Sequence, residues 1–211
     1  MRGLRGGAAI AFWMVLGAGA SASPSSLTVV VFDYARAPHE LVISAAREAH
    51  RVYRAAGVET EWILCHPMRG CDVPERFVQV KILPRPTKGM NVSSLALGST
   101  ITCDATEYCA ASYIFYDRVL AFSDDHGSPP DLTLGYVMAH EIGHLMGLGH
   151  RPGGIMTAVF SSQDLHRAAS GWLTFARDDA RELRHAVAQS QVANDTARHI
   201  KLAGWRADAD E

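Results

Sequence analysis

The first third of the chain alternates between strand-like and helix-like hydrophobic patterns. A β-branched run over Leu27–Tyr34 predicts a buried strand. From Pro38 to Gly57, apolar residues recur three or four positions apart, as they do on one face of a helix. Strand-like runs follow at Val58–Leu64 and Phe77–Leu83. This order is typical of the start of an α/β sheet, and it predicts that the first two strands are parallel.

The middle of the chain predicts two further strands. Ser94–Thr102 is a short candidate, in which Gly98 is expected to be a weak point or a bulge. Ser112–Leu120 is rich in aromatic and β-branched residues and predicts a stronger strand. The sheet would then have five strands.

The last third of the chain is predicted to be helical at two places. Asp131 is a suitable N-cap for a helix that starts near Leu132 and contains a histidine-rich segment. Residues 161–171 look irregular or weakly helical. Thr174 is expected to cap a final helix over Phe175–Gln189.

The composition fits one globular domain. The chain has 211 residues, of which 48% are hydrophobic and 20% charged, with a formal net charge of −2. That length and hydrophobic content allow a sizeable core. There is no basic patch, so nucleic acid is not an expected partner.

Residues 1–22 resemble a secretory signal. Arg2 and Arg5 precede a short apolar run, and Ala20-Ser21-Ala22 has the small-x-small pattern of a cleavage site. The alternative is a membrane anchor, but the run is shorter than the ~20 residues that a spanning helix needs. We therefore expect cleavage after Ala22.

Cleavage would leave a domain at residues 23–192 and a polar tail at 193–211. The mature protein would be secreted or periplasmic, with no membrane segment, and we expect it to be a monomer.

Four cysteines allow three disulfide pairings. Cys65 and Cys71 are six residues apart, as are Cys103 and Cys109, so these two local pairs are the economical choice. An exported protein can form disulfides. The alternative is a second metal site, but the C-x-x-C spacing typical of such sites is absent.

The chemistry of the chain is concentrated in residues 140–150, which read H-E-x-x-H-x-x-G-x-x-H. Histidines four apart on a helix lie on the same face, so His140 and His144 could bind one zinc ion together. Gly147 allows the chain to leave the helix and bring back His150 as a third ligand. Glu141 could then reach a zinc-activated water as general base.

A second motif, Gly154-Ile155-Met156, follows shortly afterwards. Together the two motifs resemble those of the metzincin superfamily of zinc metallopeptidases, in which the zinc motif is followed by a Met-turn. The resemblance implies that zinc is the cofactor and assigns roles to five residues. These are the zinc ligands His140, His144 and His150, the catalytic base Glu141, and the Met-turn residue Met156.

The same resemblance implies an α/β (α+β) zincin fold. We expect a twisted five-stranded mixed sheet with flanking helices, a zinc helix and a C-terminal helix, in a matrixin-like topology. Ser94–Ser99 would form an edge strand that pairs with an extended substrate, and residues 157–161 would form a wall of the pocket.

The sequence also departs from the known metzincin branches. Arg151 follows the third histidine, and Ala158 stands where some branches have a zinc-binding tyrosine. The first strand begins soon after the signal, which leaves no room for a pro-segment. The subfamily is therefore not assigned.

Two functions are consistent with these residues. The first is a secreted zinc-dependent endopeptidase that uses Glu141 as general base and has a peptide or protein substrate as its partner. The alternative is a secreted, zinc-stabilised binding or inhibitory module without useful hydrolysis. The intact Glu141 favours the first, because a structural zinc site has no need of a base at this position.

Overall fold

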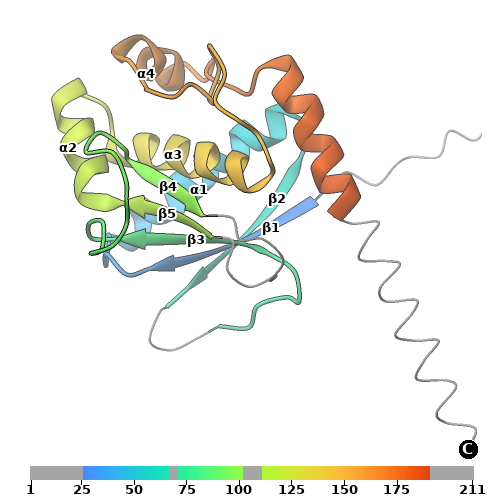
Figure 1. Ribbon diagram of the computed structural model, residues 1–211, viewed down its shortest axis with the longest axis horizontal. Coiled ribbons are helices and arrows are strands. Elements are labelled where there is room, and N and C mark those ends of the chain that lie inside the picture. The colour runs from blue at the N-terminus through green and yellow to red at the C-terminus, as the bar shows by residue number, and fades with distance from the viewer. Residues whose placement is uncertain (1–25, 67–70, 102–110, 191–211) are drawn as a thin grey trace, which may run out of the picture.

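A computed structural model describes residues 26–66, 71–101 and 111–190 (Figure 1). A last helix, at residues 177–190, follows the nine labelled elements. The labelled elements, in chain order, are β1 (Ser26–Asp33), α1 (His39–Ala55), β2 (Glu59–Cys65), β3 (Val78–Leu83), β4 (Gly98–Ile101), β5 (Ala111–Phe115), α2 (Tyr116–His126), α3 (Pro130–Leu145) and α4 (Ser162–Ala169).

The five strands form one mixed sheet in the order β2-β1-β3-β5-β4. Strands β2, β1, β3 and β5 are parallel, and β4 runs antiparallel to β5. Among the described residues, β4 therefore lies at one end of the sheet and pairs only with β5. The prediction of an α/β fold with a five-stranded mixed sheet and flanking helices is confirmed, whereas the matrixin-like topology stays a prediction.

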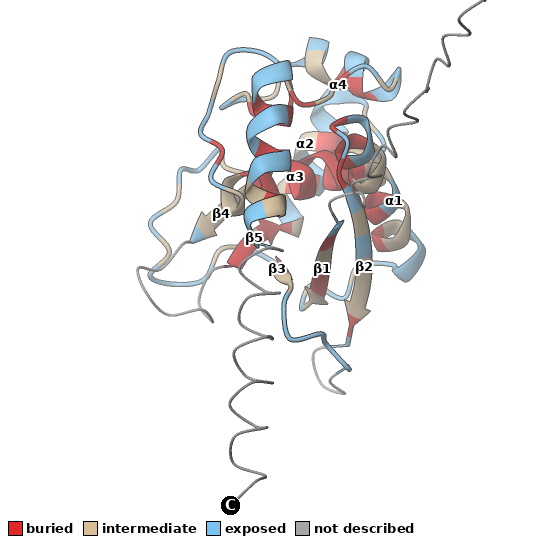
Figure 2. Cartoon of the chain, turned by 90° about the vertical axis from the view of Figure 1, so that its right-hand side faces the viewer, coloured by how far each residue is buried: buried red, intermediate tan, exposed pale blue. Residues whose placement is uncertain are grey.

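Helix α3 is at the centre of the molecule. It packs against α1 and against strands β3, β4 and β5. Every residue from Thr133 to Gly143 is buried, and Figure 2 shows the contrast with the more exposed outer helices. A helix that is buried on all sides needs apolar or small residues on all sides. Leu134, Val137, Met138 and Ile142 cover one side of α3, and the buried Gly135, Tyr136, Ala139 and Gly143 face the others.

Gly135 allows α1 and α3 to approach closely. A Cβ atom at this position would lie 2.7 Å from the main-chain oxygen of Ala45 and 2.9 Å from the Cβ of Glu48. Only glycine fits at such a contact without movement of one helix. Gly135 therefore helps to set the position of α3 relative to the rest of the core.

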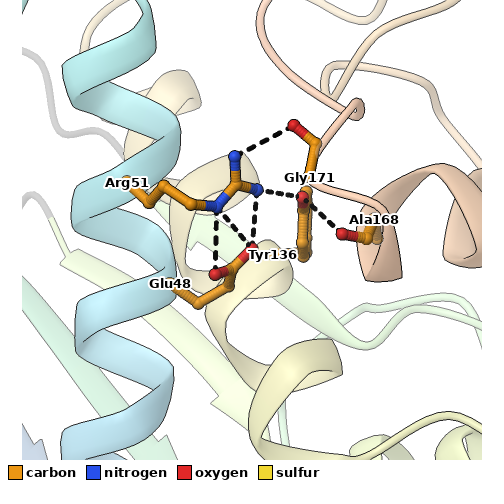
Figure 3. Close-up of polar contacts among 5 residues, drawn as sticks. All are labelled: Glu48, Arg51, Tyr136, Ala168 and Gly171. Carbon is orange, nitrogen blue, oxygen red and sulfur yellow. Dashed lines mark hydrogen bonds and ion pairs between the residues drawn. The ribbon is translucent and has the colours of Figure 1, made fainter.

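A hydrogen-bonded network ties α3 to α1 and to the segment around α4 (Figure 3). The Arg51 guanidinium donates to both carboxylate oxygens of Glu48, to the main-chain oxygen of Gly171 and to the Tyr136 hydroxyl. The Tyr136 hydroxyl is 3.4 Å from the main-chain oxygen of Ala168. The network thus joins three segments that are far apart in the sequence.

The predicted strand Ser112–Leu120 is wrong beyond Phe115. Residues Tyr116–His126 form α2 instead. Val119 and Ser123 are its buried residues, four apart as on one helix face, and Gly127 ends the helix in the left-handed region with φ of 61°. The aromatic residues at 113–116 favour a strand locally, but this helical spacing decides the structure after Phe115.

Two predicted helix caps are also wrong. Helix α3 begins at Pro130, and Asp131 accepts a hydrogen bond from Ser44 of α1 at 2.6 Å instead of capping its own helix. The last helix begins at residue 177, and the main-chain oxygen of Thr174 accepts a hydrogen bond from the N–H of Ile155. Both residues form hydrogen bonds with distant segments of the chain, and neither caps the helix that was predicted to start after it.

The segment 161–171, expected to be irregular or weakly helical, contains a regular helix. It contains α4, whose N-terminus has a complete capping box: the Ser161 side chain accepts from the Asp164 N–H, and the Asp164 side chain accepts from the Ser161 N–H.

Cys65 and Cys71 form the expected disulfide, with Cα atoms 5.4 Å apart. Cys103 and Cys109, the signal at 1–22 and the tail at 193–211 lie outside the described residues. Within the described ranges, no helix combines the length and the apolar composition required to span a lipid bilayer.

The close contact at Gly135 predicts that Gly135→Ala destabilises the protein. We expect a loss of roughly 1–3 kcal/mol from overpacking, reduced by the better helix propensity of alanine. Urea unfolding of the zinc-free protein would measure it. Gly149→Ala is the control, because a Cβ there meets nothing within 4 Å. Equal stability of the two variants would contradict the role given to Gly135.

Candidate metal centre

The end of α3 brings the three predicted ligands together. His140 and His144 lie one turn apart in the last part of the helix. Gly147 has φ of +88°, and the helix ends with hydrogen bonds from the Gly147 and Leu148 N–H groups to the main-chain oxygens of His144 and Gly143. This is the Schellman arrangement, which reverses the chain direction. His150 lies two residues after Leu148, just beyond this turn.

The three imidazoles converge through their Nε2 atoms. The Nε2 of His144 lies 3.0 Å from that of His140 and 3.1 Å from that of His150. Two nitrogens bound tetrahedrally at 2.0–2.1 Å to one zinc ion would lie about 3.3 Å apart. The observed spacing is close to that value. Within the described ranges, no other group of three or more His, Cys, Asp or Glu side chains could hold a metal ion.

Hydrogen bonds orient two of the rings for metal binding. The Nδ1 of His140 is 2.7 Å from the main-chain oxygen of Ile155, and the Nδ1 of His144 is 2.7 Å from that of Leu148. A carbonyl oxygen only accepts, so both Nδ1 atoms carry the proton. Both Nε2 atoms then point lone pairs at each other across 3.0 Å, which is favourable only with a cation between them. The donor set therefore fits a metal ion, and three nitrogens with an open fourth position fit zinc.

Burial disfavours the protonated form of His140 and of His150. Burial lowers the pKa of His140 to about 4, and the nearby His144 and His150 act in the same direction, against the hydrogen bond to Ile155. Burial, together with His144, also lowers the pKa of His150. Neutral imidazole is the form that binds metal ions, so His140 and His150 are in the metal-binding form at neutral pH.

Glu141 lies beside this centre, against strand β4. It is buried, and burial raises its pKa to about 7, while a hydrogen bond from Thr100 acts in the opposite direction. The Thr100 hydroxyl is 2.7 Å from Oε2 of Glu141 and 3.0 Å from the hydroxyl of the buried Ser112. Thr100 thus fixes one oxygen of the carboxylate.

Gly98 makes room for the same carboxylate. A Cβ at this position would lie 2.7 Å from Oε1 and 2.8 Å from Cγ of Glu141. The expectation of a bulge here is wrong, since Gly98 pairs in regular register with Ile114. The glycine is explained by the close approach of Glu141 rather than by an interruption of the strand.

Met156 lies under the C-terminal part of α3 and is fully buried. Its sulfur would be 2.7 Å from a Cβ atom at Gly143, the residue before His144. Its main-chain oxygen accepts a hydrogen bond from the Arg151 N–H at 3.0 Å. The segment that follows His150 therefore folds back beneath the helix and brings the Ile155 carbonyl to His140.

The metal centre opens into a cleft of about 570 Å³. Residues 98–100 of β4, with Ser93 and residues 95–97 before them, form one wall of the cleft, and residues 157–160 form another. The expected wall at 157–161 and the edge strand thus both border the cleft, although the strand is shorter than predicted and begins at Gly98. Phe122 and Val137 add apolar surface.

Sequence reasoning missed Thr100 and Gly98 as neighbours of Glu141. They are two residues apart in a predicted strand, and positions at this spacing lie on the same face of a sheet. Nothing in the sequence shows that this face meets α3, because the contact joins segments 41 residues apart.

Comparison with known proteins gives one family match. A family model described as "Metallopep: Putative peptidase family" matches residues 122–195, about a third of the chain. This range contains all five site residues named above. No curated protein matches the chain.

Three solved structures are distantly similar. Archaemetzincin from Methanopyrus kandleri is 16% identical with a TM-score of 0.48, over 79% of this chain and 98% of that one. Metalloproteinase-II from Bacteroides fragilis is 10% identical with a TM-score of 0.47, over 77% of this chain and 53% of that one. A zinc-dependent peptidase from Methanocorpusculum labreanum (strain Z) is 18% identical with a TM-score of 0.45, over 74% of this chain and 99% of that one.

TM-scores below 0.5 mark remote similarity, so the function proposed below rests on the residues of this chain. The family match over residues 122–195 and the three-histidine site within that range together support a metallopeptidase.

His144 lies between the other two ligands, so we expect His144→Ala to abolish zinc binding at micromolar concentration. Titration with zinc against a chromogenic chelator would measure this, and the parent should bind one ion. His126→Ala is the control, because the His126 Nδ1 lies 2.9 Å from the main-chain oxygen of Phe122 and the residue is not in the three-histidine site. Stoichiometric binding by the His144→Ala variant would contradict the assignment.

Proposed function

We propose that the chain is a zinc-dependent endopeptidase. The observation that carries the proposal is the convergence of three imidazoles beside a buried glutamate, at the side of an open cleft. A site that only stabilises the fold would fill all four positions of the metal with protein ligands. Within the described residues three such ligands are found, and the fourth position would face the cleft.

Zinc bound by the three histidines would supply Lewis-acid activation of a water molecule and of the substrate carbonyl. The chain itself supplies the base. Glu141 would accept the proton of the attacking water and later pass it to the leaving amine. Because Thr100 holds Oε2, the other carboxylate oxygen stays available for this transfer. Thr100 is thus a positioning residue for the base.

The cleft favours a polypeptide as substrate. In the part of the chain that the structure describes, β4 pairs with β5 alone, so its other edge can add an extended peptide through main-chain hydrogen bonds. The two walls are lined largely by apolar and small side chains, which suits hydrophobic residues of the substrate.

The charge of the cleft favours internal cleavage over removal of terminal residues. Enzymes that trim chain ends need a charged group to bind the terminal ammonium or carboxylate. Among the described residues that line the cleft, Glu141 is the one acidic side chain, and there is no lysine or arginine. With Glu141 engaged as the base, nothing remains in this lining to select a chain end.

We further propose that the protein acts as a monomer outside the cytoplasm, in a secreted or periplasmic location, without nucleic-acid or membrane partners after signal cleavage. The pattern of residues 1–22 motivates this. The disulfide between Cys65 and Cys71 is consistent with an oxidising compartment.

The proposal predicts that Glu141→Gln lowers the rate of peptide cleavage by roughly 10²- to 10⁴-fold, because the amide cannot take a proton. Zinc binding should be unchanged, since Glu141 is not a ligand. The assay is a mixed peptide library, with cut sites read by mass spectrometry. The exposed Glu40→Gln variant on α1 is the matched control.

Cleavage by Glu141→Gln at the parent rate would refute the mechanism. A parent protein that binds zinc stoichiometrically and cuts no peptide in the library would instead favour the alternative, a zinc-stabilised binding or inhibitory module.

A further inference from the structure

The third ligand is held differently from the other two. His140 and His144 are oriented by hydrogen bonds from Nδ1 to main-chain carbonyls. For the exposed His150, no hydrogen bond to Nδ1 is found within the described part of the chain. It also lies outside α3, in a segment without helix or strand from residue 146 to 161. Another interaction must therefore fix its position.

Arg151, the next residue, provides that interaction. Its Nε lies 3.0 Å from Oδ1 of Asp179, and its Nη2 donates to both carboxylate oxygens of Glu182 at 2.8 and 2.6 Å. Both partners are on the last helix, residues 177–190. One guanidinium thus joins the ligand-bearing segment to this helix at two points.

Asp179 makes this connection strong. Its side chain is fully buried, with 0% of its surface exposed, and its Oδ1 faces the Arg151 guanidinium. A buried carboxylate without a compensating charge is strongly unfavourable. Arg151 provides that charge, so the pair resists separation.

The helix that carries Asp179 is itself firmly placed. Leu183 and Val187 belong to the hydrophobic core and are 0% and 1% exposed. Arg184 donates to the main-chain oxygen of Ala56, at the end of α1, at 2.7 Å. Arg151 is therefore attached to a fixed part of the core rather than to another loop.

We propose that Arg151 is a positioning residue for the metal centre, which holds His150 in place by anchoring it to Asp179 and Glu182. Arg151 contacts neither the substrate nor the reacting atoms. Zinc binding and the docking of the last helix are consequently coupled. The inference rests on the metal centre of the proposed function, but its test needs no peptide cleavage.

The test measures zinc affinity by competition with a chromogenic chelator. Arg151→Met should weaken zinc binding by about 10- to 100-fold, the usual effect of losing a group that orients a ligand. The control is Arg181→Met on the same helix, where Arg181 pairs with Asp178 at 2.9 Å and both side chains are exposed. This control should bind zinc like the parent.

Arg151→Lys separates positioning from the loss of charge. Lysine keeps a positive charge beside Asp179, but it cannot form the same fork with two carboxylates. Its zinc affinity should fall between those of the parent and Arg151→Met. If Arg151→Met does not fold, the lysine variant decides the matter alone, and parent-like affinity would overturn the proposal.

A second experiment measures the effect of zinc on the last helix. Binding at one site that favours the docking of a distant element must show the same effect in reverse. Zinc should slow amide hydrogen exchange in residues 177–190 of the parent and of Arg181→Met, and should do so much less in Arg151→Met. Equal slowing in all three would overturn the coupling.

The outcomes for this inference and for the proposed function are distinguishable. A parent that binds zinc without cleaving peptides refutes the function and leaves the affinity test intact. Parent-like zinc affinity in Arg151→Met refutes the role of Arg151 and leaves the function intact. A parent that binds no zinc refutes both.

Discussion

The burial of α3 on all sides is the constraint on which the rest of the structure depends. A helix in this position normally carries mostly apolar residues, yet His140 and Glu141 are among the buried residues of α3. Each needs a partner, because an unpaired polar group in the core is costly. The Ile155 carbonyl oxygen accepts a hydrogen bond from His140, and the Thr100 hydroxyl donates one to Glu141. These two contacts fix where the segment after His150 and the edge strand must lie, and so they shape the cleft.

Close packing around α3 also explains three glycines. Gly135 faces α1, Gly143 faces Met156, and Gly98 of β4 faces Glu141, and in each case a Cβ would lie 2.7 Å from a neighbouring atom. Each glycine brings one neighbouring segment to van der Waals distance of the helix. The geometry of the site is thus set partly by the absence of side chains at these three positions.

Local features of the site were predictable from the sequence, whereas distant contacts were not. The convergence of His140, His144 and His150 follows from helix geometry and one glycine turn within eleven residues, so the sequence alone implies it. The five-stranded sheet follows from runs of β-branched residues. The contacts of Thr100 with Glu141 and of Arg151 with Asp179 join segments far apart in the chain, and only the fold reveals them. The same reason explains the wrong prediction for Asp131, which accepts a hydrogen bond from Ser44 instead of capping its own helix.

The central claim is that three imidazoles bind one zinc ion and leave one position for water. Zinc-edge X-ray absorption spectroscopy on the purified, zinc-loaded protein tests it most directly, because the fine structure counts imidazole ligands and measures their distances. The account predicts three imidazole nitrogens at about 2.0–2.1 Å and one oxygen, with no sulfur. A spectrum with sulfur in the first shell, or with fewer than three imidazoles, would contradict it.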